Sequence, residues 1–358
     1  MTGRKLPLIA VALAVLIAII YSQRASLALT LMDRVASQRI ATDVLAELPD
    51  GLHVILCGAG GPLPDPERSG PCVAVVAGST LVIVDSGTGG VRNLNRMQIN
   101  AGNIDTLLLT HFHSDHIDGL GEIAMMRWVN AANQQPLPVI GPTGVDAVVD
   151  GFNRAYQADA VYRNEHHTDL VAPLSGSGMK AVAFEPPAKG VIKTVYEKQG
   201  LTISTFSVDH APVSPAVGYR FDYKGRSAVI SGDTSKSMTV EKVANGVDLL
   251  VHEALAPHLV NIMHNAATKV GNVIAAKITH DILDYHASPV EAAETASAAD
   301  VGYLLYYHVV PPLIAPGMEA AFLAGVSDVY DGRLSVGVDG SMISLPANAD
   351  SIISDQRM

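Results

Sequence analysis

The pattern of apolar and polar positions divides the chain into an N-terminal apolar segment and a longer region of short strands and helices. Residues 6–20 contain no charged side chain, and residues 25–50 place their apolar side chains at helical spacing. From residue 51 onward, short β-branched runs alternate with helical segments. This alternation predicts a layered α/β domain over residues 51–346, followed by a tail at 347–358.

The N-terminal segment has the features of a signal peptide or a membrane anchor. Arg4 and Lys5 precede the apolar run, whose length suits a long signal-peptide core or a short anchor. Basic residues before such a run favour an N-terminus in the cytoplasm. We therefore expect a signal peptide or anchor at 1–24, a linker or stalk helix at 25–50, and an exported domain, periplasmic or anchored by residues 6–20.

Individual apolar runs predict particular elements of the α/β domain. Two β-branched runs on either side of residues 77–80 indicate a hairpin, and residues 104–110 read as a buried strand. Residues 257–285 have helical character and interrupt the succession of strands. This insertion is a candidate apolar lid over a substrate, to which Ile262, Met263, Val270 and Ile274 would contribute.

Composition and charge narrow the class of protein. The chain has 358 residues, of which 48% are hydrophobic and 16% charged, and its formal net charge is −11. An acidic surface repels nucleic-acid backbones at long range, so we expect a nucleic-acid substrate to be disfavoured. The only cysteines, Cys57 and Cys72, would form a single disulfide in an exported domain or remain two buried thiols.

Side chains that ligate metals follow several of the predicted strands. A lone histidine in such a position is more often a core or surface residue, but three histidines and two aspartates lie within residues 111–118. Imidazole and carboxylate groups are the ligands that zinc accepts where thiolates are absent. The candidate metal ligands are, in chain order, His111, His113, Asp115, His116, His210, Asp233 and His308.

The spacing within residues 111–116 suggests two metals rather than one. In the sequence HxHxDH, the first two histidines can reach one ion, and the aspartate and third histidine can reach a second. A lone aspartate elsewhere could bridge both ions. Two metals about 3.5–4 Å apart can share an activated water and stabilise both oxygens of an in-line displacement.

The order of these motifs resembles the metallo-β-lactamase superfamily, and within it the tRNase Z-like branch that also includes arylsulfatase-type enzymes. The resemblance covers about residues 51–346. It rests on the ordered set "THFHSDHIDG" at 110–119, "VDHAPVSPAVGYR" at 208–220, "SGDT" at 231–234, "LLVHEAL" at 249–255, "HAS" at 286–288 and His308.

The resemblance implies a fold and a set of roles. The fold would be a four-layer αβ/βα sandwich with a dinuclear site at one edge. His111, His113 and His210 would hold one Zn²⁺, whereas Asp115, His116 and His308 would hold the other. Asp233 would bridge the two ions, and Asp85 would orient ligands from behind. Mn²⁺ and Fe²⁺ use the same ligands.

The implied reaction is ester hydrolysis by a metal-bridging hydroxide. Asp115 would orient this nucleophile and accept its proton. His286 would donate a proton or hydrogen bond to the leaving group, and Glu253 would hold that imidazole.

The substrate is less closely defined by the sequence. Residues 173–200 carry four lysines but no long glycine- and proline-rich arm of the kind that docks tRNA in tRNase Z. With the acidic charge and the expected export, this favours a small phosphodiester or sulfate ester and disfavours nucleic acid as a partner. The alternatives are a 3′ tRNA-processing endoribonuclease and a non-catalytic, membrane-tethered metal-binding protein. Families of this kind are often homodimers.

Overall fold

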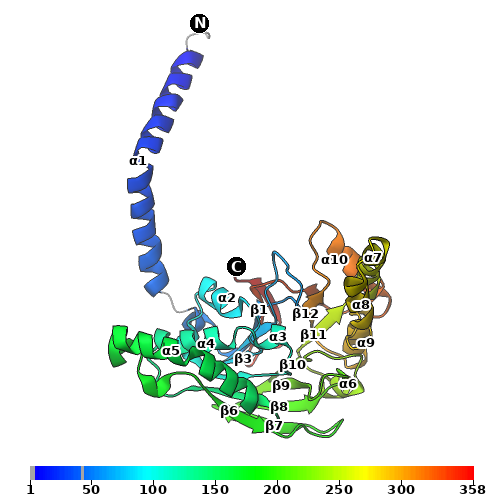
Figure 1. Cartoon of the computed structure of the whole chain (residues 1–358). Coiled ribbons are helices and arrows are strands. Elements are labelled where there is room, and N and C mark those ends of the chain that lie inside the picture. The colour runs from blue at the N-terminus through cyan, green and yellow to red at the C-terminus, as the bar shows by residue number, and fades with distance from the viewer. Residues whose placement is uncertain (1–4, 42–43) are drawn as a thin grey trace. The chain divides into compact units, whose positions relative to one another are not determined.

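The computed structural model describes residues 5–41 and 44–358 (Figure 1). The chain divides into two compact units, Met1–Val44 and Leu45–Met358. The described part of the first unit is one long helix. The two sheets and the remaining helices belong to the second unit.

Helix α1 (Lys5–Ala41) is continuous across residue 24, where we expected a signal or anchor to end and a stalk to begin. No glycine or proline occurs between residues 8 and 41, so nothing in this stretch interrupts a helix. By length and composition alone, residues 9–38 of α1 could cross a membrane. Arg4 and residues 42–43 lie outside the described residues, and a 3₁₀ turn, η1 (Leu45–Glu47), follows.

The first sheet of the second unit has eight strands in the order β15-β14-β1-β2-β3-β4-β5-β6. Strands β2 and β3 form the predicted antiparallel hairpin, whereas β3, β4, β5 and β6 run parallel. The strands are β1 (Gly51–Gly58), β2 (Cys72–Ala77), β3 (Thr80–Val84), β4 (Ile104–Leu108), β5 (Leu137–Pro142), β6 (Met179–Phe184), β14 (Ser341–Pro346) and β15 (Ile353–Gln356).

The second sheet has seven strands in the order β13-β12-β11-β10-β9-β8-β7. Strands β7 to β10 pair antiparallel, and β10 to β13 pair parallel. The strands are β7 (Lys193–Lys198), β8 (Leu201–Ser207), β9 (Val217–Tyr223), β10 (Arg226–Ile230), β11 (Leu249–Leu255), β12 (Leu304–Val310) and β13 (Leu334–Val336).

Three apolar layers hold the two sheets and their helices together. The central layer joins the facing sides of the sheets and includes Val54, Val75, Tyr219 and Leu305. On the outer side of the first sheet pack α2 (Gly90–Arg96), α4 (Leu120–Asn130) and the start of α5 (Val145–Val171). On the outer side of the second sheet pack α6 (Met238–Val243), α9 (Pro289–Ala298) and α10 (Met318–Phe322). This is the expected αβ/βα four-layer sandwich.

The remaining helices are short or lie at the edge of the sandwich. The expected insertion at 257–285 forms a helical hairpin of α7 (Pro257–Lys269) and α8 (Val273–Asp281). Helix α5 is the longest helix of the second unit, and most of its second half is exposed. The others are α3 (Ser114–Ile117) and the 3₁₀ turns η2 (Ala101–Asn103), η3 (Leu174–Gly176) and η4 (Val326–Asp328).

The C-terminal segment differs from the expectation, and the state of the two cysteines, which the sequence left open, is defined by the structure. Residues 347–358, which we expected to be a tail, contain β15, which pairs with β14 and extends the first sheet. All four residues of β15 are exposed, so the strand has no apolar alternation by which the sequence could reveal it. Cys57 and Cys72 form a disulfide between β1 and β2, and both residues are fully buried.

Candidate dinuclear metal centre

The HxHxDH segment lies directly after β4, at the carboxyl end of a parallel strand. Ligand sites in open α/β sheets concentrate at such ends, where the strand backbone no longer pairs with its neighbours. His111 and His113 come from the loop, and the single turn of α3 carries Asp115 and His116. His111 and His116 are completely buried, whereas Asp115 stays partly exposed.

The other three candidate ligands come from the second sheet. His210 follows β8 and Asp233 follows β10, and both are buried. His308 lies within β12, where the pairing register with β11 shifts so that Glu253 faces Tyr307 and Ala254 faces Val309. His308 is therefore the extra residue of a bulge, with a φ of 46°. A bulge of this kind turns a side chain away from its ordinary direction.

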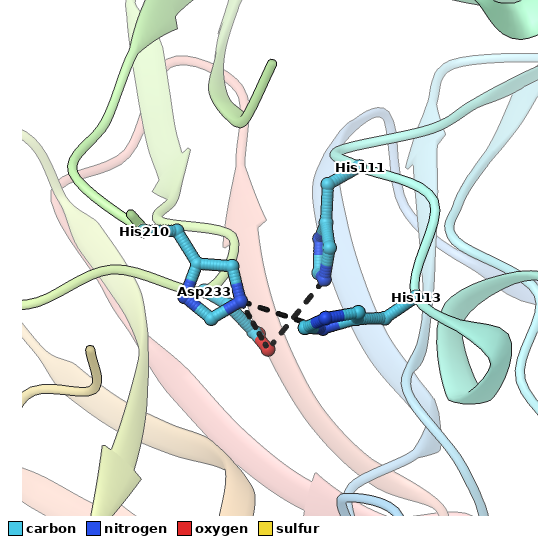
Figure 2. A group of neighbouring side chains, drawn as sticks. All are labelled: His111, His113, His210 and Asp233. Atoms are coloured by element: carbon cyan, nitrogen blue, oxygen red, sulfur yellow. Dashed lines mark hydrogen bonds and ion pairs between the residues drawn. The ribbon is translucent and has the colours of Figure 1, made fainter. Parts of the chain in front are cut away.

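All seven candidate ligands converge between the two sheets. The ligand atoms of His111, His113, His210 and Asp233 lie within 4.8 Å of one another (Figure 2). The same holds for a second group, Asp115, His116 and His308. A third group that meets this criterion consists of Asp233, His286 and His308.

Asp233 occupies the middle of this arrangement. Its Oδ2 lies 3.3 Å from Nε2 of both His116 and His308, and 3.8 Å and 3.9 Å from Nε2 of His111 and His210. One carboxylate thus faces histidines of both ligand groups, which is the position of a bridging ligand.

Hydrogen bonds on the far side of three imidazoles fix which nitrogen carries the proton. His116 Nδ1–H donates to Asp85 Oδ2 (2.8 Å), and His210 Nδ1–H donates to the carbonyl oxygen of Tyr285 (2.9 Å). Thr110 Oγ1 donates to Asp85 and therefore accepts from His111 Nδ1–H (3.0 Å). In each case the Nε2 lone pair is left facing the centre, as metal ligation requires.

Several buried ligand atoms have no hydrogen-bond partner, which is consistent with a metal site. Among the described residues, His111 Nε2, His116 Nε2 and Asp233 Oδ1 have no hydrogen-bond partner although they are shielded from solvent. Leaving such atoms unpaired is costly unless a cation satisfies them. The donor set, imidazole plus carboxylate without thiolate, suits Zn²⁺, Mn²⁺ and Fe²⁺.

The charges of the site favour a cation at its middle. Burial lowers the pKa values of His111, His113 and His210, so these imidazoles are neutral and able to ligate. For His116, burial opposes protonation, but Asp233 and Asp85 raise its pKa well above the ordinary value. The carboxylates that favour a proton there also favour a divalent metal ion.

Asp85 supports the centre from behind, as the resemblance implies. It directly follows β3, has a φ of 58° and is buried. Besides the two contacts already given, its Oδ1 accepts the backbone N–H of Thr110 (2.8 Å). One carboxylate thus holds the start of the HxHxDH loop and the orientation of His116.

Glu253 and His286 form a second hydrogen-bonded pair beside the centre. His286 Nδ1 lies 3.0 Å from Glu253 Oε1, which also accepts the backbone N–H groups of Thr234 (3.1 Å) and Ala287 (3.2 Å). Burial disfavours the charged imidazole, but Glu253 outweighs it and raises the pKa of His286 to about 9. His286 is therefore protonated at neutral pH, and its side chain lines the adjoining pocket.

A pocket of about 260 Å³ adjoins the centre. His113, Asp115, Asp233, His286 and His308 line one side of it, and α7 and α8 line the other. Of the four side chains expected in an apolar lid, Met263 lines the pocket. Ile262, Val270 and Ile274 do not, because they lie on the outer faces of the hairpin with exposed fractions of 64%, 78% and 71%.

Sequence reasoning missed two supporting residues. Thr110 bonds both Asp85 and His111, and Tyr285 holds His210 through its carbonyl oxygen and packs its ring against His286. The only signal in the sequence is their position, directly before His111 and His286. His252, in the middle of β11, hydrogen-bonds the carbonyl of Glu253 and belongs to none of the ligand groups found among the described residues.

Comparison with known proteins identifies the family. The sequence profile of the Metallo-beta-lactamase superfamily matches residues 65–280. The chain belongs to the metallo-β-lactamase superfamily. Ribonuclease Z of Mycobacterium bovis (strain BCG / Pasteur 1173P2) is 36% identical over 293 residues, covering 80% of this chain and 96% of the relative. Ribonuclease Z of Mycobacterium avium (strain 104) is 37% identical over 298 residues, covering 83% and 99%.

Solved structures of the superfamily share the fold. The metallo-β-lactamase fold protein YhfI from Bacillus subtilis has a TM-score of 0.59 and 19% identity, covering 83% of this chain and 100% of its own. Human tRNase Z, short form, has a TM-score of 0.58 and 20% identity, covering 82% and 99%. The resemblance to the tRNase Z-like branch is confirmed, whereas these relatives lend no support to its arylsulfatase-like part.

Proposed function

We propose that this chain is a metal-dependent phosphodiesterase of the ribonuclease Z type that cleaves RNA endonucleolytically, as in 3′ processing of precursor tRNA. The observation that carries the proposal is the convergence of two ligand groups on Asp233, beside the pair Glu253–His286. The relatives named ribonuclease Z match nearly their whole length, and they favour RNA over the small ester that acidity and expected export suggested.

The residues divide into two binding sets. His111, His113 and His210 would hold one divalent metal ion, and Asp115, His116 and His308 the other, with Asp233 shared between them. Two such ions supply Lewis-acid activation of water and of the phosphoryl oxygens.

The chain's own groups provide the proton transfers. Burial opposes ionisation of Asp115, but His308 and His116 keep its pKa below the ordinary value, so its carboxylate is ionised, orients the attacking water and accepts the proton that the water loses. His286, protonated and held at Nδ1 by Glu253, donates the proton that the departing ribose oxygen needs.

The decisive assay offers the zinc-loaded full chain a precursor tRNA with a 3′ extension, alongside bis(p-nitrophenyl) phosphate. The proposal predicts one endonucleolytic cut that releases the extension, with binding that weakens steeply as salt rises. Hydrolysis of the nitrophenyl diester without any cleavage of the RNA would contradict the RNA substrate and leave the phosphodiesterase in place.

The second candidate is a phosphodiesterase of small diesters, and the pocket favours it. Among the described residues that line the pocket, none is lysine or arginine. The four lysines of 173–200 do not form a long arm either, because this stretch consists largely of β6, β7 and a short connection. A panel of nitrophenyl phosphodiesters and sulfate esters beside the RNA separates the two candidates.

We also propose that the second unit lies outside the cytoplasm. The buried disulfide Cys57–Cys72 is typical of an oxidising compartment, and the apolar helix α1 with its preceding basic residues supports export. Thiol alkylation in denaturant without reductant, after the cells are quenched in acid and read by mass, should leave both cysteines unmodified. Alkylation of both would contradict this location.

A further inference from the structure

The pocket beside the metal centre has two chemically different walls. One wall is made of predicted metal ligands and His286. The opposite wall comes from the segment after β1, from the ends of β11 and β12, and from the α7–α8 hairpin with the residues that follow it. Its residues are Pro62, Leu63, Leu255, Val260, Met263, Ala275, Ile278, Thr279, Ile282, Tyr285 and Val310.

We propose that this second wall, the apolar wall, is a binding site for one uncharged apolar or aromatic substituent of the ester that the centre hydrolyses. The inference rests on the proposed phosphodiesterase activity. It adds the chemical nature of the group that is bonded to the scissile phosphate. With about 260 Å³, the pocket is slightly smaller than the range of about 300–1,000 Å³ for whole ligands, so it takes a single group.

The apolar wall offers few hydrogen bonds to a substrate, because the hydroxyls of Thr279 and Tyr285 are the polar side-chain groups on it. Leu255, Val260 and Val310 are at most 4% exposed and form its base. The hydroxyl of Thr279 donates to the carbonyl of Ala275 (2.7 Å) and is therefore already paired. A sugar hydroxyl or a second phosphate pressed against this wall would lose its water without replacement, which is unfavourable.

Charge excludes a second anion from the same space. The carboxylates of Asp115 and Asp233 border the pocket, and among the described residues that line it the cationic side chain is His286, whose charge is already paired with Glu253. The positive charge of metal ions at the centre would be neutralised by their carboxylate ligands, the hydroxide and the scissile phosphate. Further phosphates of a polyanionic substrate must therefore lie outside this pocket, whereas the flat face of a nucleobase or an aryl ring fits it.

The α7–α8 hairpin decides which groups enter. It rests on a small cluster of its own, Leu255, Val260 and Val310 with Ile282 and Leu283, separate from the three large apolar layers. Ile278 lines the pocket and is 55% exposed, so it lies at the mouth. Ile274, one turn earlier on α8, is 71% exposed and does not line the pocket, which makes it a matched control.

The test compares the binding of phenylphosphonate and methylphosphonate to the zinc-loaded full chain by isothermal titration calorimetry. Both probes present the same anion to the metals and differ in the substituent. We expect phenylphosphonate to bind about tenfold more tightly, since apolar pockets discriminate at about this level. Ile278→Asp should abolish the difference, and Ile274→Asp should preserve it. Both variants should keep the zinc content and circular dichroism of the unaltered chain.

The outcomes separate this proposal from the function on which it rests. Equal binding of the two phosphonates, or equal effects of Ile278→Asp and Ile274→Asp, would overturn the apolar site while leaving phosphodiester hydrolysis in place. A tenfold preference in a zinc-loaded chain that hydrolyses no phosphodiester would support the apolar site and overturn the proposed function.

Discussion

Replacing Asp85 by asparagine should weaken metal binding without touching any predicted ligand. Asp85 Oδ2 accepts a hydrogen bond from His116 Nδ1–H, and this contact leaves Nε2 free for a metal. An asparagine oxygen can still accept from the Thr110 backbone, but its NH₂ group then faces His116 as a donor. His116 must accept with Nδ1 and carry its proton on Nε2, where it blocks ligation. Asparagine also tolerates the φ of 58°, so the backbone need not move.

The expected size of the effect follows from the contacts. Loss of a partner that orients a metal-bound histidine lowers metal affinity about 10–100-fold, or about 1.4–2.7 kcal/mol. Asp85 Oδ2 also accepts from Thr110 Oγ1–H, so two buried hydrogen bonds to a charged group are lost, and at about 1.5–3 kcal/mol each this should reduce the free energy of unfolding of the metal-free chain by about 3–6 kcal/mol.

Competition with a chromogenic chelator measures the zinc affinity, and chemical denaturation of the metal-free chain measures stability. Asp339→Asn is the matched control, because Asp339 is also buried and accepts the backbone N–H groups of Ala59 and Ser69 (both 3.0 Å) but contacts no predicted ligand. It should lose similar stability and keep its zinc affinity. Unchanged zinc affinity in Asp85→Asn would refute the argument that Asp85 sets the tautomer of His116.

Three further predictions concern the centre itself. Asp233→Ala should lose bound metal and phosphodiesterase activity together, because the shared carboxylate is removed. Metal analysis and a rate assay on the same samples test this prediction, and full metal content in the variant would count against a bridging role. His286→Ala should retain metal but lower kcat about 10²–10⁴-fold, the usual contribution of a general acid. Because the pKa of His286 is raised to about 9, the rate of the unaltered enzyme should fall above about pH 9 as the acid form is lost, and a pH–rate profile of the variant should lack that fall.

Much of the centre could be predicted because its signals are local. The HxHxDH segment places four candidate ligands within six residues, and His210, Asp233 and His308 each follow or end an apolar run. The two-sheet sandwich follows from the alternation of buried strands and helices. The order of the motifs along the chain resembles that of a known family, and this resemblance predicts which distant segments come together in the fold. Hydrophobic periodicity alone does not determine that arrangement.

Other features depend on three-dimensional context that the sequence does not display. Ile274 and Ile278 are alike in sequence, yet only Ile278 lines the pocket, because the choice depends on how α8 is rotated over β11 and β12. The bulge that turns His308 inward arises from a register shift between two strands. All four residues of strand β15 are exposed, so no hydrophobic pattern in the sequence predicts the strand.

The most direct test of the central claim is a zinc titration of the metal-free full chain, with bound zinc and the rate of bis(p-nitrophenyl) phosphate hydrolysis measured on the same samples. The account predicts that two zinc ions bind per chain and that the rate rises with their binding. A chain that binds no zinc, or that hydrolyses the diester at a rate independent of bound metal, would contradict it.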